Sequence, residues 1–447
     1  MTSSFRILPF ALALAALFPG LTSSLNAQAA PARQVVDSVP VVRIDSMLDL
    51  PTVVARTLAA SPSVRQAEAG LSNARSGERV AGGAYLPSLS VTSSALRSDI
   101  VSATPTPAAS SGNAYSAGLA SSIDLYTGGR RTADRARTRA DLQAAEAIDI
   151  GQRYQMTLIA ERAFYEVLRG GDLVTVAEAR VARAQRGLRY AQDRVRAGTA
   201  TKSDELRARL EFTTGQQQSI AARDTLQTAA YALGRLVGAD GPIGARRPAS
   251  LDPRALALSD SEIVRLAVGS APAVHASEAA ARAADAAARS AKSAFLPDIR
   301  LGGGYNWATQ SPILGATRPG WQLALATSFP LFNGFQREDA VARSVAAADV
   351  SRVTALDATR LVRTEASRLI SALRFAERNI ALASEAVSAA QEDLRVQTER
   401  YRAGIATALD RQSSEFAVTQ AELGLVAARY NYQVTRATLE ALVGRTL

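Results

Sequence analysis

The sequence contains no cysteine among its 447 residues. Without a thiol the chain can form no disulfide, thiolate nucleophile, cysteine-ligated metal site or lipoprotein anchor. Histidine is almost as scarce, since His275 is the only one and lies early in a predicted helix. A lone histidine supports neither a catalytic triad nor a zinc site. We therefore predict no active site, no metal and no cofactor, and interpret His275 as a surface residue.

Aromatic residues make up only 5% of the chain, and lysine occurs only at positions 202 and 292. Abundant alanine with few aromatics favours long helices that pack closely on small residues. The formal charge of +10 is therefore carried almost wholly by arginine. These arginines alternate with acidic residues instead of forming a block, which is typical of solvated helix faces. We expect no nucleic-acid partner.

Long apolar runs are missing as well. The run from Ile7 to Phe18 is too short to span a bilayer as a helix, and Arg6 precedes it. With the Ala27-Gln28-Ala29 cleavage pattern it predicts a secretory signal peptide over 1–29, followed by a periplasmic segment over 30–60. No later stretch predicts a spanning helix, so a membrane location would require a β-barrel.

The chain contains two copies of one unit. The segment Arg194–Gly198 recurs 206 residues later as Arg400–Gly404, and Leu236-Val237-Gly238 recurs as Leu442-Val443-Gly444. Farther upstream the offset is 210, as between Ser61-Pro62 and Ala271-Pro272. We predict a first repeat over 61–240 and a second over 271–447, joined by a linker and short helix over 241–270.

Each repeat predicts a helix, two strands, a long helix, a turn and a final helix. In the first copy these are 62–84, strands 89–96 and 115–125 joined by a proline- and serine-rich stretch over 98–114, then 131–196 and 201–236. The second copy predicts a helix over 272–294 and strands over 298–307 and 321–329, with no later proline except Pro330. A helix over 131–196 would measure about 100 Å, far longer than a globular domain.

The predicted strands alternate with period two. Leu301, Tyr305 and Trp307 point to one face, whereas Arg300 and Asn306 point to the other. An apolar face with aromatic ends fits a lipid-facing barrel strand, although a half-buried sheet of a soluble protein has the same alternation. The expected aromatic girdle of the barrel consists of Tyr115, Tyr305, Trp307, Trp321 and Phe329.

The long helices carry an apolar residue every seven positions, which predicts a left-handed coiled coil. A second line consists of small residues, including Gly170 and Ala376, and we interpret Gly170 as a packing position. The apolar lines are Val167, Val174, Val181, Leu188 and Val195 in one copy, and Leu373, Ile380, Val387, Leu394 and Tyr401 in the other.

These features resemble the TolC-like outer-membrane efflux protein family. The resemblance covers nearly the whole chain after the signal peptide. It rests on the duplication, on two Arg-x-Ala-Gly turns followed by Asp204 and Asp410, and on the ending Ala428–Tyr432. It implies a mainly α fold with a small transmembrane β part: a periplasmic coiled-coil tunnel plus four strands per chain that complete a 12-stranded barrel in a homotrimer. Four strands alone cannot close a barrel in lipid, which agrees with this expectation.

The expected function is a passive outer-membrane channel of a tripartite efflux or type I secretion system. The resemblance implies a periplasmic adaptor and an inner-membrane pump of the RND, ABC or MFS type. A periplasmic coiled-coil scaffold or adaptor without a pore is the alternative, and a secreted enzyme lacks candidate residues. Drug efflux and protein secretion both stay open, whereas only three methionines (Met1, Met47 and Met156) disfavour soft-metal export.

Two groups of site residues follow from the resemblance. The adaptor-docking tips are Arg196, Ala197 and Gly198 in one copy and Arg402, Ala403 and Gly404 in the other, although both glycines also fit simple helix caps. The channel constriction is assigned to Asp410 and Ser413, where Ser413 replaces a second acidic residue of the family. Stabilisation of the N-terminal end of its helix is the alternative role for Asp410, and it is our preferred interpretation for Asp204.

Overall fold

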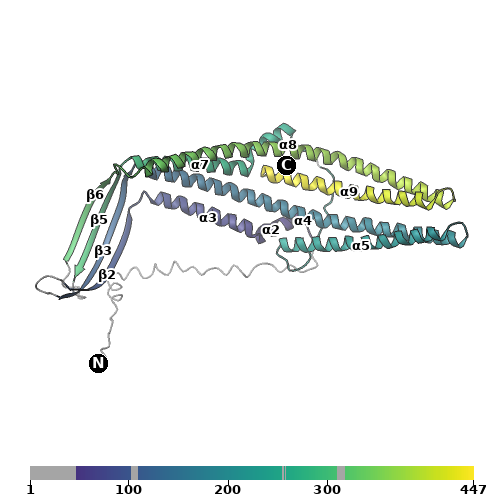
Figure 1. Ribbon diagram of the computed structural model, residues 1–447, viewed down its shortest axis with the longest axis horizontal. Coiled ribbons are helices and arrows are strands. Elements are labelled where there is room, and N and C mark those ends of the chain that lie inside the picture. The colour runs from purple at the N-terminus through teal and green to yellow at the C-terminus, as the bar shows by residue number, and fades with distance from the viewer. Residues whose placement is uncertain (1–46, 102–108, 254–255, 257, 310–317, 447) are drawn as a thin grey trace, which may run out of the picture.

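The computed structural model describes residues 47–101, 109–253, 256, 258–309 and 318–446. A long helical body carries a four-stranded sheet at one end (Figure 1). The predicted signal peptide and residues 30–46 lie outside the described residues. In chain order the elements are β1 (Met47–Leu48), α2 (Leu50–Ala60), α3 (Pro62–Gly83), β2 (Ser88–Val101), β3 (Ala109–Thr127), α4 (Arg130–Arg196), α5 (Lys202–Leu236), β4 (Gly244–Ala245), α6 (Asp260–Ser270), α7 (Pro272–Lys292), the 3₁₀ turn η2 (Ser293–Phe295), β5 (Asp298–Thr309), β6 (Arg318–Ser328), α8 (Gln336–Arg402) and α9 (Ala408–Val443).

The two longest helices, α4 and α8, have 67 residues each and so extend about 100 Å. Neither contains proline, and alanine and arginine, which are good helix formers, dominate both. Their observed bounds confirm the predicted long helices. Among the described residues, no helix combines the length and the apolar character that crossing a membrane requires.

The helices form one curved layer. Both α3 and α5 pack against α4, while α7 and α9 pack against α8 and also reach α4 (Figure 1). Neighbouring helices approach each other closely where small residues face them. A Cβ atom on Gly170 of α4 would lie only 3.1 Å from the Cα atom of Leu226 on α5. This contact confirms Gly170 as a packing position.

Two hydrophobic cores lie midway along the body, and the first also includes Val426 and Tyr430 of α9. Phe164 and Leu233 lie in the first core, and their counterparts 206 residues later, Ile370 and Leu439, lie in the second. The repeat also extends farther upstream than predicted, because α2 and α6 are 11-residue helices at equivalent positions, 210 residues apart. A two-residue parallel ladder between β1 and β4 closes the first core.

The sheet is antiparallel with the order β2-β3-β5-β6, so β3 and β5 join the two repeats. The strands of the first copy are longer than predicted. The stretch 98–114, expected to be a loop, contributes the end of β2 and the start of β3, paired from Ser98 opposite Gly112 to Val101 opposite Ala109. Serine and threonine tolerate extended backbone, so the polar composition of this stretch hid its strands.

Candidate functional site

One face of the sheet is apolar and exposed. The register aligns Leu301 with Leu325, and Tyr305 with both Leu119 and Trp321, so apolar side chains follow one another across the strands. Trp321 is 77% exposed and Leu325 is 66% exposed. An exposed apolar surface that is continuous over several strands indicates a contact with lipid or with another protein.

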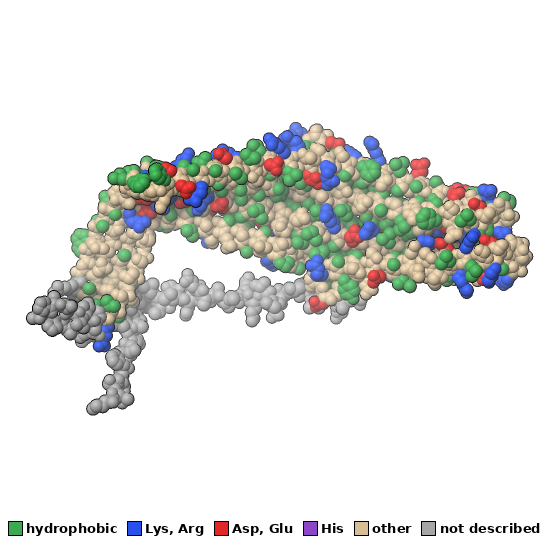
Figure 2. All heavy atoms as spheres, in the orientation of Figure 1, with side chains coloured by type: hydrophobic (Ala, Val, Ile, Leu, Met, Phe, Trp, Pro, Cys, Tyr) green, Lys and Arg blue, Asp and Glu red, His purple; other side chains and the backbone are tan. Residues whose placement is uncertain are grey.

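The opposite face carries small and polar side chains. Ser122, Gly302 and Ala324 align there, and Ser94 bonds Ser116 at 2.8 Å. Its charged residues pair, since Arg300 Nε donates to Asp124 Oδ1 at 2.6 Å. Figure 2 shows charged side chains spread over the helical body and sparse over the sheet. The sheet thus has one lipid-compatible and one water-compatible face.

Aromatic residues lie toward both ends of this sheet. Four of them lie toward the end remote from the helices: Tyr115, Tyr305, Trp307 and Trp321. The rings of Tyr305 and Trp307 pack edge to face, with their centres 4.5 Å apart. Phe329 follows β6 at the helical end. The prediction missed two neighbouring rings there, the exposed Phe332 and Phe335, which pack edge to face at 5.5 Å. Their closeness to Phe329 in sequence was the available signal.

The two hairpin tips at the other end of the body have the same backbone geometry. Gly198 and Gly404 adopt left-handed conformations with φ values of 72° and 78°, which accounts for glycine at both turns. At the ends of the long helices, the backbone N–H groups of Ala197 and Ala403 donate hydrogen bonds to the carbonyls of Asp193 and Glu399. The six predicted tip residues therefore form two equivalent helix C-terminal turns.

Asp410 and Asp204 both close capping boxes. Thr407 donates its backbone amide and its hydroxyl to Asp410 Oδ2 at 2.9 and 2.7 Å, and the Asp410 amide donates back to Thr407 Oγ1 at 3.2 Å. Thr201 and Asp204 repeat this arrangement. The backbone bond, followed by the hydroxyl bond, lowers the pKa of Asp410, so its exposed carboxylate stays charged. Ser413 is exposed one turn later.

The tips also contact each other. The Arg194 guanidinium lies 4.7 Å from the centre of the Tyr401 ring and donates to the Tyr401 carbonyl at 3.2 Å. Arg402, a predicted docking residue, stacks on Tyr190 of α4 and donates to its hydroxyl. Arg402 thus joins the two hairpins, whereas Arg196 bonds only the nearby Asp193 on its own helix and is mostly exposed.

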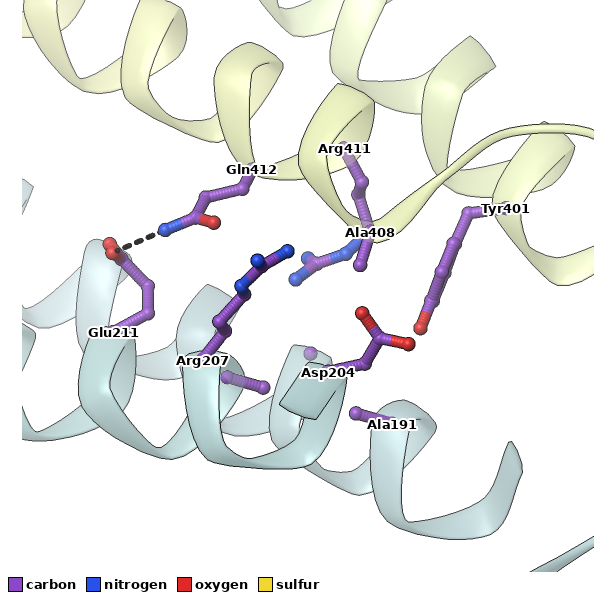
Figure 3. Close-up of a pocket in the computed structure, with 10 residues that line it drawn as sticks. Ala191, Asp204, Arg207, Glu211, Tyr401, Ala408, Arg411 and Gln412 are labelled. Atoms are coloured by element: carbon purple, nitrogen blue, oxygen red, sulfur yellow. Dashed lines mark hydrogen bonds between the residues drawn. The ribbon is translucent and has the colours of Figure 1, made fainter. Parts of the chain in front are cut away.

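A buried ion pair within α9, on the side that packs against the first hairpin, was not predicted. Arg411 Nη1 donates to Glu415 Oε1 at 2.6 Å, and both residues are more than nine-tenths buried. Arg411 borders a small pocket that all four tip helices line, together with Arg207 and Tyr401 (Figure 3). Gly187 makes room for it, because a Cβ there would lie 2.4 Å from Arg411 Nη2. A glycine in a long helix was the signal in the sequence.

The described residues contain no group of three or more histidine and acidic side chains arranged to hold a metal ion. Several ionic contacts link one helix to another, as between Arg153 and Glu68 and between Arg352 and Asp285.

A helical body about 100 Å long, with an amphipathic sheet at one end, is the fold of solved outer-membrane channels. The chain belongs to the outer membrane efflux protein family, whose sequence model matches residues 53–239 and 263–445. This membership confirms the predicted family, fold class and outer-membrane location. None of the curated protein sequences compared with the chain matches it.

Solved structures share the fold at low sequence identity. VceC, an outer membrane protein of Vibrio cholerae, is 21% identical with a TM-score of 0.77, over 89% of this chain and 96% of VceC. The CmeC outer membrane channel of Campylobacter jejuni is 15% identical with a TM-score of 0.78, over 88% and 85% of the two chains. The open state of the Neisseria gonorrhoeae MtrE channel is 21% identical with a TM-score of 0.69, over 89% of each chain.

Proposed function

We propose that three copies of this chain form one passive duct through the outer membrane. The observation that carries the proposal is the exposed apolar face of a sheet whose outer strands, β2 and β6, each have one unpaired edge. Unpaired backbone groups cannot remain in lipid, so the edges must join those of other copies. Three sheets would close a barrel of about 12 strands, within the size range of known outer-membrane barrels.

The helical body would continue the duct into the periplasm. Its length of about 100 Å suits a tunnel that crosses this compartment. The chain would conduct solutes that an inner-membrane pump delivers through a periplasmic adaptor, and the pump would supply the energy. The exposed Arg196 and the turns at Ala197–Gly198 and Ala403–Gly404 offer the adaptor a surface at the far end.

The constriction would lie at the start of α9. In a trimer the exposed carboxylates of Asp410 would form a ring of three negative charges, with Ser413 one turn above. Stacking of Arg194 on Tyr401 and of Arg402 on Tyr190 supports a restrained tip, because both contacts join the α8–α9 hairpin to α4. Opening would then require these stacks to separate.

Cell fractionation followed by native mass spectrometry tests this proposal against the pore-free scaffold. We expect the mature protein in the outer membrane and, in detergent, a species with three times the mass of one chain that dissociates on heating. A folded monomer or dimer released with the soluble periplasmic contents would contradict the duct and support the scaffold.

A further inference from the structure

The start of α4 has an unusual charge. Of its first ten residues, Asp134 is the only acidic one, and five are arginine: Arg130, Arg131, Arg135, Arg137 and Arg139. The amino-terminal end of a helix carries the positive end of the helix dipole, so basic side chains are unfavourable there. The equivalent helix α8 follows the usual rule, with Glu338 and Asp339 in its first turn. The arginines of α4 therefore indicate a role other than helix stability.

These arginines lie on two sides of α4. Arg130 lies 3.8 Å from Asp298 of β5, which belongs to the polar face of the sheet. Arg137 follows two turns later on the same side of the helix. Arg135 and Arg139 come five and nine residues after Arg130, so they are rotated from it by about 140° and 180°. They therefore lie on the side of α4 that continues the apolar face of the sheet.

The two neighbouring helices each add an arginine to this side. Arg282 of α7 donates to Gln143 of α4 at 3.0 Å, and Gln143 follows Arg139 by one turn. Arg289 follows Arg282 by two turns and so lies on the same side of α7. Arg79 of α3 is the equivalent of Arg289, 210 residues earlier. We call the four residues Arg79, Arg135, Arg139 and Arg289 the outer basic patch.

Two contacts set the levels of the three helices. Ser290 of α7 donates to Asp134 Oδ1 of α4 at 2.9 Å, and Glu78 of α3 lies 3.8 Å from Arg139. The other arginines of the outer basic patch are direct sequence neighbours of these contact residues. The four arginines therefore lie within about two helical turns of one another along the helix axes.

The outer basic patch is exposed and has few acidic partners. All four of its arginines are exposed. Within the described part of the chain, Arg79 bonds only the hydroxyl of Ser76, and no carboxylate pairs with Arg135 or Arg289. Glu78 approaches Arg139 no closer than 3.8 Å. Most of the positive charge is therefore available to a partner.

The patch begins where the apolar surface ends. Where the sheet meets the helices, four large apolar side chains are more than two-thirds exposed: Leu86, Leu331, Phe332 and Phe335. Arg135 and Arg139 follow about 8 and 14 Å along α4. The headgroup layer of a bilayer extends roughly 5–8 Å beyond the hydrocarbon on each side. Helix side chains lean toward the amino-terminal end, which for α4 is the end at the sheet (Figure 1), so these two arginines can reach the headgroups.

We propose that the outer basic patch binds phosphate groups of anionic phospholipids in the periplasmic leaflet. The inference rests on the proposed duct and adds a lipid partner to its position in the membrane. Guanidinium groups bind phosphate oxygens through paired hydrogen bonds, and basic residues beside a membrane segment attract anionic lipids. In the trimer, three such patches would surround the duct just below the barrel.

A second copy and an adaptor fit this position less well than lipid. The helix α4 packs between α3 and α7 of its own chain, so Arg135 and Arg139 do not lie at an edge of the helical layer. The hairpin tip at Arg196 lies about 85 Å farther along α4 than Arg139. An adaptor bound at the tips would therefore contact a different part of the molecule.

Native mass spectrometry of the purified trimer in detergent, with added phosphatidylglycerol or phosphatidylcholine of the same acyl chains, tests the proposal. We expect the wild-type trimer to bind the anionic lipid about tenfold more tightly. The variant Arg135→Gln/Arg139→Gln should lose most of this preference. The matched variant Arg130→Gln/Arg137→Gln removes the same charge from the opposite side of α4 and should keep it. Circular dichroism first shows that both variants are folded.

Wild-type trimers that bind both lipids equally, or variants that lose the preference equally, would overturn the patch but leave the duct intact. Added salt should reduce the preference, because it screens exposed charges, and a preference that salt does not change would also contradict the proposal. A protein that copurifies with the wild type and is lost only from Arg135→Gln/Arg139→Gln, without any lipid preference, would assign the patch to a protein partner instead. Absence of wild-type trimers would contradict the proposed function itself.

Discussion

Asp410 and Asp204 make the same hydrogen bonds at the start of α9 and α5. The same substitution at either position therefore weakens the helix cap in the same way. We expect Asp410→Asn to reduce the preference of the open channel for cations, because it removes the proposed ring of charge. The matched variant Asp204→Asn should leave this preference unchanged. Reversal potentials in a salt gradient measure the effect, and equal shifts in both variants would refute a special role for Asp410.

Glu161 makes stability depend on pH. Burial in α4, and secondarily the nearby Glu440, raises its pKa to about 7 from 4.5, while Arg436 opposes the shift. The folded state therefore holds a proton that the unfolded state releases between pH 4.5 and 7. The stabilisation is complete below pH 4.5 and is lost as pH rises through about 7.

Replacing Glu161 by glutamine removes this charge at every pH. Because the side chain is partly exposed, we expect Glu161→Gln to stabilise the protein by only about 1–2 kcal/mol at pH 8, with a much smaller effect at pH 5. Thermal unfolding followed by circular dichroism at both pH values measures the difference. Glu166→Gln, on the exposed face of the same helix, serves as the control and should show no such pH dependence.

At the scale of elements, long helices were the easiest to predict from sequence. The absence of proline and the seven-residue line from Leu373 to Tyr401 give α8 its length and its packing face. Shorter elements lack such periodicity. The helix α2 was missed, and β1 and β4 have two residues each, so only their tertiary contacts define them.

Within the candidate site, residues with a local sequence signal were predicted, whereas residues defined only by tertiary contacts were not. A glycine directly after a helical pattern is a local signal, because glycine readily adopts the left-handed backbone that ends a helix. Gly198 and Gly404 could therefore be predicted as turn residues. The buried Arg411–Glu415 pair depends on Gly187, which lies more than 220 residues away in sequence. Gly187 marks a position of close packing in the sequence, but it does not identify Arg411 as the partner, because that contact exists only once the hairpins pack.

The sheet gives a prediction of its own. Leu325 and Ala324 are neighbours on β6 and point to opposite faces, with cross-strand partners Leu301 and Gly302. We expect Leu325→Arg to cost about 2–4 kcal/mol on the lipid side and to reduce the yield of outer-membrane trimer strongly. The matched variant Ala324→Arg should assemble normally, because its side chain would face the water-filled interior of the proposed barrel. Equal loss in both variants would contradict the assignment of the faces.

At the scale of the whole molecule, duplication accounts for most of the architecture. Each half supplies two strands, one long helix and one hairpin tip, in the same order along the chain.

The central claim is that this assembly conducts. The most direct measurement is the single-channel conductance of the purified mature trimer in planar lipid bilayers. We expect steady, long-lived openings with current proportional to voltage and a preference for cations. Trimers that are folded by circular dichroism and insert into the bilayer, yet carry no current under any applied voltage, would contradict it.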